Sequence, residues 1–526
     1  MPDEISETDL TTASRDQGRV RGLLLLFSPA ALSGALVALP FLYPGLFPLT
    51  WISLVPLLWG IERVRTRLRA FLLAWLAGAV ALTLGFYWIE HTARVFGGFP
   101  HGLSEIVLLL FAILASLPIA LFGLLVRLCG LGPLQVFPAL LWVAIEFLFP
   151  QLFPWHLANS QSQWLVLIQS ADLVGLYGVS FLLVWFNALV YAALLSPERS
   201  RRNFIPNAAV LVVVLTGNML YGHVRLKNVA AEMSAARAVD VAVIQGSIDI
   251  KHKWNVSYLE SNLKSYLDLT RKVPSASLYL WPESAVEAWV PEDMERLPAE
   301  IVPTLPSGSS LIFGARSFIG KPDSPDMKAF NSAFLIDSEG QVYGRYHKQV
   351  LLAFGEYIPF APILSKVPGM PPVGEGFSRG AGPVTLDLPG GIKVAPLICY
   401  EDIMPELARR FVKEKGANLL VNLTNDAWFG DTVAPWLHAR LAQWRAIETR
   451  RSLVRVTNTG LTTVINPKGE MLDTLPLFAP GVLTAKVEIM EGETLYVRYG
   501  DWFAWIMVAG SILILWRGRR LRAPAR

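Results

Sequence analysis

Cys399 stands where an apolar run gives way to polar residues. The run Val394–Ile398 ends at this cysteine, and Tyr400, Glu401 and Asp402 follow it before a segment with helical spacing. This order predicts a strand, a turn and a helix, with the thiol at the turn. Free N–H groups at a helix N-terminus stabilise a thiolate and also an oxyanion. This context alone leaves two interpretations open, a nucleophile and a buried structural cysteine.

A nucleophilic cysteine needs a base and a group that stabilises charge on the attacked carbonyl. Glu283 follows the apolar stretch Leu280–Pro282. Partial desolvation there raises a carboxyl pKa toward the range useful for a base. Lys348 ends a predicted hairpin, and its point charge suits an oxyanion, while Glu356 is near enough in sequence to pair with it or to support the base. A surface glutamate and a solvated lysine are the alternative interpretations.

Two histidines, His347 and His438, are alternative bases for a cysteine–histidine pair, but a structural role is the favoured interpretation of both. The chain has only two cysteines, Cys129 and Cys399, which are too few for a disulfide framework or a cysteine-ligated metal site. None of the seven histidines repeats at the i, i+4 spacing of a helical zinc site. The sequence therefore predicts no metal and no cofactor.

The composition indicates that part of the chain crosses a membrane. Of 526 residues, 53% are hydrophobic and 17% are charged, against about 45–50% and 25% in ordinary soluble chains. A uniformly soluble or disordered chain is excluded. The net charge of +4, without a long Lys/Arg tract, argues against a nucleic-acid partner.

Eight apolar stretches are predicted to cross the membrane. They are residues 22–41, 42–61, 71–91, 105–128, 133–150, 176–195, 205–222 and 502–516. Arginine clusters before the first stretch and after the second, fourth, sixth and eighth fall on one side if the spans alternate. The positive-inside rule then places both termini in the cytoplasm and the block between the last two spans on the other side. Glu90 and Glu146 fall at or within spans, where a functional carboxylate or a hydrogen-bonded structural one is expected.

The block between the last two spans has a different periodicity. Short β-branched runs predict strands at 239–245, 278–281, 311–315, 332–336, 394–399, 419–423 and 453–457. Tyr258–Lys272 and Pro405–Lys415 have one apolar face each, and Gly416 ends the second helix. Asp337–Gly340 and Asn466–Gly469 are typical of hairpin turns. This pattern predicts one α/β or α+β domain.

Taken together, the contexts of Glu283, Lys348 and Cys399 resemble the Glu-Lys-Cys triad of the nitrilase superfamily. The stretches Tyr346-His347-Lys348, Gly355-Glu356-Tyr357-Ile358-Pro359 and Ile398-Cys399-Tyr400-Glu401 are especially close. With eight spans around such a domain, nearly the whole chain resembles the bacterial apolipoprotein N-acyltransferase family, including the membrane stretches Ala158–Gln161 and Gly175–Ser180.

The resemblance implies a fold and a set of roles. The fold is an α-helical membrane domain of eight transmembrane helices plus an α/β nitrilase-like αββα sandwich. We expect a membrane domain at 1–222, a periplasmic catalytic domain at 223–500, and a last helix with a basic cytoplasmic tail at 501–526. Cys399 is implied as nucleophile, Glu283 as general base and Lys348 as oxyanion stabiliser. Supporting or substrate-binding roles are implied for Glu356, Glu401, Tyr400 and Trp254.

The same resemblance implies the reaction and its partners. The protein is expected in the bacterial inner membrane, as a monomer. Cys399 would take a fatty acyl chain from a phospholipid, the sn-1 chain of phosphatidylethanolamine, as a thioester. The α-amine of the diacylglyceryl-cysteine of an apolipoprotein would then receive it, with ping-pong kinetics. The sequence does not determine the preferred acyl chain, headgroup or lipoprotein.

Three other functions fit parts of the sequence. A membrane-tethered amidase would use the same triad with water as acceptor. A transporter or lipid-binding protein would not need Cys399, and a cysteine–histidine protease would need His347 or His438. The apolar segment Ala353–Gly380, with Phe360, Leu364 and Met370, is interpreted either as a lid that touches lipid or as a packed loop.

Overall fold

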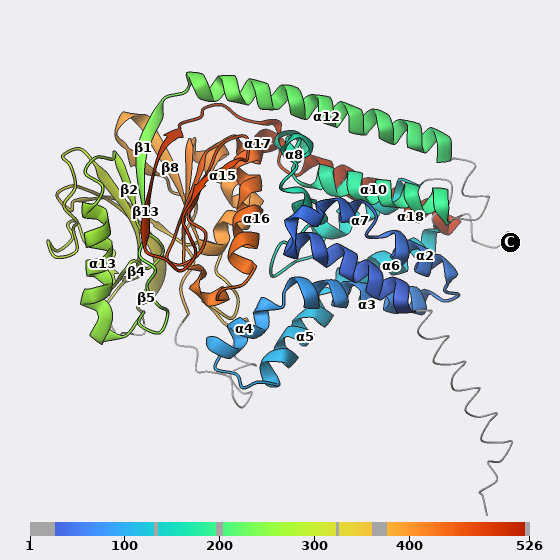
Figure 1. Cartoon of the computed structure of the whole chain (residues 1–526), viewed down its shortest axis with the longest axis horizontal. Helices are drawn as coiled ribbons and strands as arrows, with labels where there is room; N and C mark the ends of the chain where they lie inside the picture. The colour runs from blue at the N-terminus through green and yellow to red at the C-terminus, as the bar shows by residue number, and fades with distance from the viewer. Residues whose placement is uncertain are drawn as a thin grey trace, which may run out of the picture.

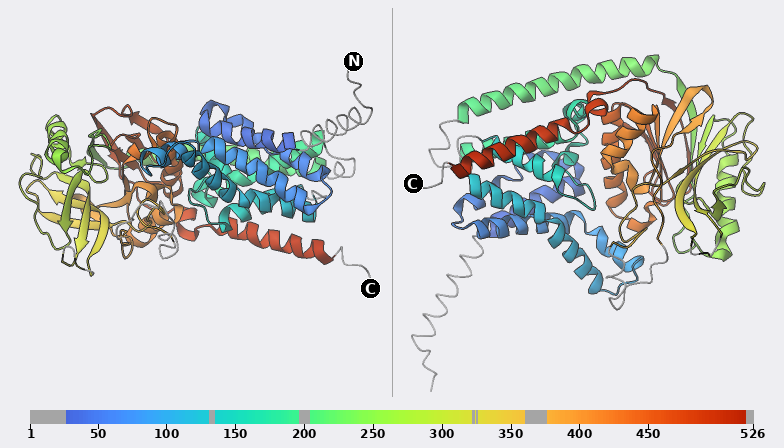
Figure 2. Two further views of the ribbon diagram at one scale, coloured as in Figure 1. Left: turned by 90° about the horizontal axis from the view of Figure 1, so that it is seen from below. Right: turned by 180° about the vertical axis from the view of Figure 1, so that it is seen from behind.

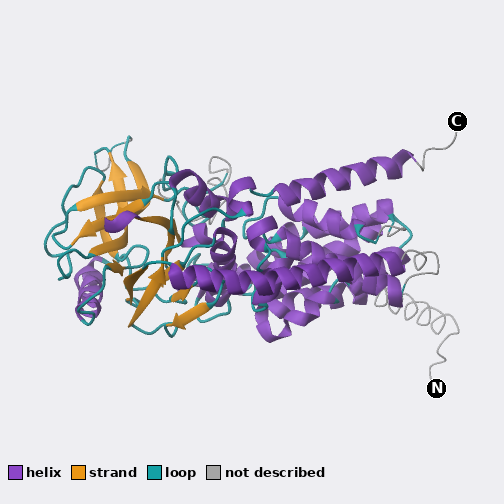
Figure 3. Ribbon diagram, turned by 90° about the horizontal axis from the view of Figure 1, so that it is seen from above, coloured by secondary structure: helices purple, strands orange, loops and turns teal. Residues whose placement is uncertain are grey.

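Two bodies, one of helices and one of sheets, lie end to end along the molecule (Figures 1 and 3). The computed structural model describes residues 27–130, 135–195, 204–321, 324, 326–359 and 376–520. The helices form one end of the molecule and the strands gather at the other, and both the first described helix, Phe27–Leu42, and the last, Trp502–Arg520, belong to the helical end (Figure 2).

The helical body is built from the predicted apolar stretches. Its elements are the helix Phe27–Leu42, η1 (Pro44–Trp51), α2 (Val55–Arg63), α3 (Arg67–Gly85), α5 (Leu103–Ala115), α6 (Leu117–Cys129), α7 (Phe137–Leu148), α10 (Tyr177–Leu194), α12 (Phe204–Ala235) and α18 (Trp502–Arg520). Five helical segments are long and apolar enough to span a membrane: Pro44–Arg63, Arg67–Gly85, Leu103–Cys129, Tyr177–Leu194 and Phe204–Ala235. The other three predicted spans fall on shorter apolar helices in the described residues, so the count of eight stays a prediction.

Helix α12 connects the two bodies and runs along one side of the molecule (Figure 1). Its 32 residues span about 48 Å. Only Leu211, Gly222 and Val229 are buried, and apolar side chains such as Val213 are largely exposed. A helix with so apolar an exposed surface suits contact with lipid. The helix continues beyond the predicted domain boundary at residue 222 to Ala235, immediately before the first strand.

Two sheets make up the second body. The seven-stranded sheet has the order β13 (Gly481–Glu488), β1 (Ala238–Gln245), β2 (Leu278–Leu280), β4 (Ser310–Ile319), β5 (Lys328–Asp337) and β6 (Val342–His347), with β3 (Val286–Pro291) also paired to β4. The six-stranded sheet has the order β12 (Met471–Thr474), β11 (Thr463–Ile465), β10 (Leu453–Thr457), β9 (Leu419–Thr424), β8 (Ile392–Ile398) and β7 (Leu386–Leu388). The seven strands predicted from the sequence are all present.

Helices cover the outer faces of both sheets. One apolar cluster joins inward side chains of the two sheets, for example Val241 with Val421. A second cluster packs α13 (Leu259–Arg271) on the seven-stranded sheet. Helices α15 (Pro405–Lys415) and α16 (Ala434–Thr449) contribute to the cluster on the six-stranded sheet. The layers are therefore helix, sheet, sheet, helix, the αββα order expected from the sequence (Figure 1).

Helix α16 packs in the apolar cores of both bodies. Its Ala442 and Ala446 pack in the sheet core, whereas Trp444 and Ile447 pack in the core of the helical body. The Trp444 indole N–H also donates to Ser162 Oγ at 3.0 Å. Through α16, the six-stranded sheet, whose strand β8 leads to Cys399, is packed onto the helical body.

Parallel pairing sets the positions of the candidate site residues. Strands β1, β2 and β4 are mutually parallel in one sheet, and β8, β9 and β10 are in the other. Glu283 follows β2 and Cys399 follows β8, so both come from the carboxyl ends of parallel strands. Such ends are where ligands bind in open α/β sheets.

Candidate active site

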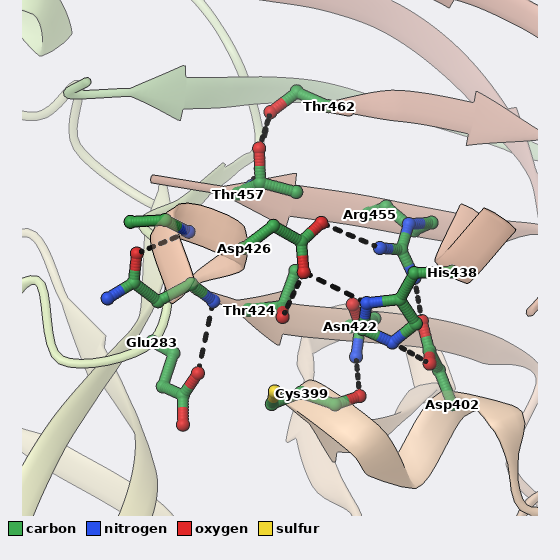
Figure 4. Close-up of polar contacts among 12 residues, drawn as sticks. Glu283, Cys399, Asp402, Asn422, Thr424, Asp426, His438, Arg455, Thr457 and Thr462 are labelled. Carbon is green, nitrogen blue, oxygen red and sulfur yellow. Dashed lines mark hydrogen bonds and ion pairs between the residues drawn. The ribbon is translucent and has the colours of Figure 1, made fainter. Parts of the chain in front are cut away.

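Cys399 sits on a sharply turned backbone. Strand β8 ends at Ile398, and Cys399 has a φ of +51°, in the left-handed region that non-glycine residues rarely adopt. It opens the short 3₁₀ turn η5 (Cys399–Ile403), and α15 begins only at Pro405. The amide of Asn422 donates to the Cys399 carbonyl at 2.9 Å and fixes this turn (Figure 4). A strained backbone at a functional position is consistent with a nucleophile held in one orientation.

The environment of the thiol differs from the one expected from the sequence. Burial raises the pKa of Cys399 to about 11, and the charge of Glu283 adds to this effect, while Lys348 and His438 oppose it. The predicted strand, turn and helix are present, but Cys399 opens the five-residue 3₁₀ segment η5 and not α15 itself, which begins at Pro405. The resting group is a neutral thiol, and it needs a base to become a nucleophile.

Glu401 ties the turn to the loop that carries Lys348. Its carboxylate accepts the N–H groups of Ile398 at 2.8 Å, Gln349 at 2.6 Å and Val350 at 3.0 Å. The Tyr346 hydroxyl donates to the same carboxylate at 2.9 Å. Burial raises the pKa of Glu401 to about 7 against the opposing effect of Lys348 and these donors. This buried carboxylate therefore sets the position of Lys348 relative to Cys399.

Glu283, Lys348 and Glu356 form one charged cluster. The Lys348 Nζ lies 2.8 Å from Glu356 Oε2 and 4.0 Å from Glu283 Oε1. Burial alone would lower the pKa of Lys348, but Glu356, Cys399 and Glu283 raise it above its usual value, so the ammonium stays charged. Burial raises the pKa of Glu283, with Lys348 opposing. A carboxylate with this shift is suited to accept a proton near neutral pH.

Two asparagines complete the cluster, and sequence reasoning missed both. The Asn331 amide donates to Glu283 Oε1 at 2.7 Å and to Glu356 Oε1 at 2.9 Å. The backbone N–H of Asn425 donates to Glu283 Oε2 at 3.0 Å (Figure 4). Strand β4 approaches closely here, because a Cβ at Gly314 would lie 2.6 Å from the Glu283 Cα. The Glu283 carboxylate is therefore held in a single orientation by neighbours from both sheets.

His438 was an alternative base in the sequence, and the structure gives it another environment. Its Nε2 lies 2.8 Å from Asp402 and its Nδ1 lies 2.9 Å from Asp426. Arg455 pairs with both aspartates from behind (Figure 4). Burial would lower the pKa of His438, but Asp426 raises it overall. With carboxylates on both ring nitrogens, the imidazole has no lone pair to offer the thiol.

The described ring contacts of His347 are with residues other than the cysteine. Its Nδ1 lies 2.7 Å from Ser332 Oγ and its Nε2 lies 3.0 Å from Glu292. Trp254 is also separate from the charged cluster, since its N–H donates to Glu287 at 2.9 Å and its ring lies 4.4 Å from the Arg316 guanidinium carbon. Among the described residues, no hydrogen bond, ion pair or ring contact joins Trp254 to Cys399, Glu283 or Lys348.

Cys399 opens into a pocket between the two bodies. The cavity volume of this pocket is about 60 Å³. The helical body supplies mostly aromatic and apolar walls, among them Phe41, Phe86, Trp88, Phe153 and Trp155. The sheet body supplies Leu352, Cys399, Tyr400, Ile403, His438 and Arg440. Cys399 thus lines a pocket whose other walls are mostly apolar.

Tyr400 forms part of the wall of this pocket. Its hydroxyl donates to the carbonyl of Leu152, and its ring lies 6.1 Å from that of Phe153. The structure therefore brings Tyr400, Glu401 and the three triad candidates together. Of the segment Ala353–Gly380 interpreted as a lid, residues 360–375, which include Phe360, Leu364 and Met370, lie outside the described residues.

The two carboxylates near the predicted spans have structural partners. Glu146 accepts the Trp142 indole N–H at 2.7 Å and the Leu157 N–H at 2.8 Å. Glu90 pairs with Arg94 at 2.9 Å and accepts the Ser104 hydroxyl at 3.1 Å. These contacts favour the structural interpretation of both residues.

Comparison with known proteins identifies two family segments. Residues 33–189 match the family described as apolipoprotein N-acyltransferase N-terminal domain, and residues 240–494 match the family described as carbon-nitrogen hydrolase. Among solved structures, Saccharomyces cerevisiae Nit3, a member of branch 10 of the nitrilase superfamily, is 18% identical, with a TM-score of 0.36 over 48% of this chain and 90% of that one.

Curated relatives cover nearly the whole chain. The apolipoprotein N-acyltransferase of Geobacter metallireducens is 37% identical over 92% of this chain and 94% of its own length. The enzyme of the same name from Methylococcus capsulatus is 32% identical over 96% of both chains. The nitrilase-like α/β body, the apolar helices and these relatives agree, and the chain belongs to the apolipoprotein N-acyltransferase family.

Proposed function

We propose that the chain is a membrane-embedded bacterial acyltransferase that acylates the N-terminal α-amine of apolipoproteins. The acyl donor is a phospholipid, the sn-1 chain of phosphatidylethanolamine, and the acceptor is the diacylglyceryl-cysteine. One observation carries the proposal: the Cys399 thiol opens into an apolar pocket between the helical body and the sheet body, beside the charged cluster of Glu283 and Lys348. This arrangement gives an amphiphile access to a nucleophile without leaving an apolar environment.

In the first half-reaction the Cys399 sulfur attacks the ester carbonyl of the phospholipid. Because the pKa of the thiol is raised to about 11, deprotonation must accompany the attack, and Glu283 takes the proton. The permanently charged Lys348 stabilises the oxyanion. The tetrahedral intermediate collapses to a thioester, and the proton returns to the departing lysophospholipid alkoxide.

In the second half-reaction the α-amine of the lipoprotein attacks the thioester. Glu283 accepts the proton that the amine loses, and the thiolate leaves to become the resting thiol again. The product is an amide, which is far less reactive than the thioester. Kinetics are ping-pong, because the lysophospholipid leaves before the lipoprotein reacts.

The other candidates support these steps. Glu356 holds Lys348 and, through Asn331, the base Glu283. Glu401 holds the Cys399 turn against the Lys348 loop, and Tyr400 shapes the pocket wall. Trp254, on a loop beside Arg316, is assigned a part in substrate binding.

The proposal includes the topology predicted from the sequence. The membrane domain is 1–222, the catalytic domain is 223–500 and faces the periplasm, and 501–526 forms the last helix and a cytoplasmic tail. Cysteine labelling from each side of intact vesicles tests this arrangement. Access to position 399 only from the cytoplasmic side contradicts it.

The decisive experiment looks for the acyl-enzyme. The purified chain is incubated with phosphatidylethanolamine in detergent micelles, and the peptide that contains Cys399 is analysed by mass spectrometry. We expect a fatty acyl adduct on Cys399 that disappears on addition of a diacylglyceryl lipopeptide, with the acyl group recovered on the lipopeptide amine. Release of free fatty acid from the adduct, with no lipopeptide product, would instead indicate a hydrolase. Cys399→Ala must form no adduct.

A further inference from the structure

Arg440 lines the pocket and has no polar partner among the residues that the structure describes. It projects from the face of α16 that also carries Leu437 and Leu441, and all three line the pocket. The residue is only partly exposed. In the part of the chain that the structure describes, no hydrogen bond, ion pair or ring contact engages its guanidinium, and burial lowers its pKa to about 10. A partly desolvated guanidinium in an apolar wall is unfavourable unless an anion reaches it.

Two other arginines, one in α16 and one directly after it, have carboxylate partners. Arg445 pairs with Glu448 at 2.8 Å, and Arg450 pairs with Asp172 at 2.8 Å. Among the described residues that line the pocket there is no Asp or Glu, and Arg440 is the only Lys or Arg. The pocket therefore has one fixed positive charge that lacks a counterion from the protein.

We propose that Arg440 binds the phosphate of the donor phospholipid while the sn-1 ester of the same molecule reaches Cys399. This inference rests on the proposed function. Both residues line one pocket, and the ester and the phosphate sit at opposite ends of a single glycerol unit. A planar guanidinium makes paired, charge-assisted hydrogen bonds to phosphate oxygens. The exposed Gln163, also at the pocket, offers neutral hydrogen bonds to the same headgroup.

Arg440 distinguishes the two substrates of the reaction. The acceptor carries a diacylglyceryl group without phosphate, and its α-amine is cationic before it reacts. An arginine in the pocket attracts the phospholipid and gives the acceptor no matching anion. Its contribution therefore falls on the first half-reaction and leaves the second unchanged.

The test separates the half-reactions. Full-length wild type, Arg440→Gln and Arg440→Lys are compared in nonionic detergent micelles with limiting phosphatidylethanolamine, and the rate of thioester formation on Cys399 is measured. We expect Arg440→Gln to react about tenfold or more slowly, and Arg440→Lys to lie between it and the wild type. With p-nitrophenyl palmitate, an acyl donor without phosphate, all three rates should agree. Pre-acylated Arg440→Gln should transfer to lipopeptide at the wild-type rate.

The test has one control variant and several outcomes that would contradict the inference. Arg271→Gln, an exposed arginine on α13, should match the wild type throughout. Equal rates of Arg440→Gln and wild type with limiting phospholipid overturn the inference, and so does an equal loss with p-nitrophenyl palmitate, which indicates a structural role. Competition by excess inorganic phosphate in the wild type but not in Arg440→Gln would indicate a free-anion site rather than a headgroup site. No thioester in the wild type means that the proposed function itself is wrong.

Discussion

The hydroxyl of Tyr400 donates a hydrogen bond to the backbone carbonyl of Leu152. The residue next to Cys399 is thereby fastened to the loop that follows α7 in the helical body. The turn that presents the thiol and the aromatic wall of the pocket are consequently held in one geometry. Motion of one body relative to the other would change the distance between the sulfur and a bound lipid.

Tyr400→Phe removes this hydrogen bond and keeps the ring. The Leu152 carbonyl loses a donor, which costs about 1 kcal/mol, and the Cys399 turn becomes less well fixed. We expect thioester formation to slow about two- to tenfold with little change in the melting temperature. Tyr499→Phe, which changes an exposed hydroxyl, is the matched control. An unchanged rate in Tyr400→Phe would show that the contact is dispensable.

Glu283→Gln should convert the acylation step into one limited by spontaneous ionisation of the thiol. With a pKa of about 11, only about one thiol in ten thousand is ionised at pH 7. We expect a loss of about 10²- to 10⁴-fold at pH 7 and a rate that rises tenfold per pH unit until the thiol ionises, which should occur below pH 11 because the charge of Glu283 no longer raises the pKa of Cys399. The wild type should instead lose activity as the pH falls through the raised pKa of Glu283, since the base works as the carboxylate. Stopped-time mass spectrometry of the Cys399 peptide across pH measures both profiles, and parallel profiles would exclude Glu283 as the base.

Substitutions at Lys348 and Glu356 test whether the charged cluster contributes to stability, to catalysis or to both. Lys348→Met leaves Glu283 and Glu356 buried without their cation, and we expect a loss of about 3–5 kcal/mol in unfolding free energy. The double variant Lys348→Met/Glu356→Gln removes one of these charges and should recover part of the stability. It should recover no acyl transfer, because the oxyanion still lacks its cation. Thermal unfolding in detergent and the acylation rate are the two readouts, and activity in the double variant would contradict the role of Lys348.

Asp172 holds the helical body, α12 and the sheet body together. Its carboxylate lies 2.8 Å from Arg450 at the end of α16 and 2.8 Å from Arg225 of α12. Asp172→Asn leaves the buried Arg450 without its counterion, and we expect about 3 kcal/mol lower stability and slower acylation. Glu232→Gln removes only the more exposed partner of Arg225 and should cost less than about 1 kcal/mol. Equal effects of the two variants on thermal unfolding would contradict a special role for Asp172.

The sequence by itself determined the elements with a regular pattern. The seven predicted strands, the helices α13 and α15, and the hairpin at Asp337–Gly340 are confirmed, since each has apolar residues at a clear period or a turn signal at its end. The sequence also predicted Glu283, Lys348 and Glu356 as partners, and they meet in one cluster, while their catalytic roles stay a proposal. No single residue identifies the triad, and the combination of Glu283, Lys348 and Cys399 was predicted from the family resemblance.

Other features depend on contacts that only the tertiary structure brings about. Helix α16 has no single apolar face, because one side packs on a sheet and the other on the helical body, so its sequence lacks the amphipathic signal. Asn331 contacts Glu283 from β5 of the same sheet and Asn425 contacts it from the other sheet, and both are distant from Glu283 in sequence. The raised pKa of Cys399 and the pocket around Arg440 likewise arise from burial between two bodies. The local sequence pattern indicates which face of a segment is apolar. The desolvation of a titratable side chain and the position of its counterion depend on residues that are distant in sequence.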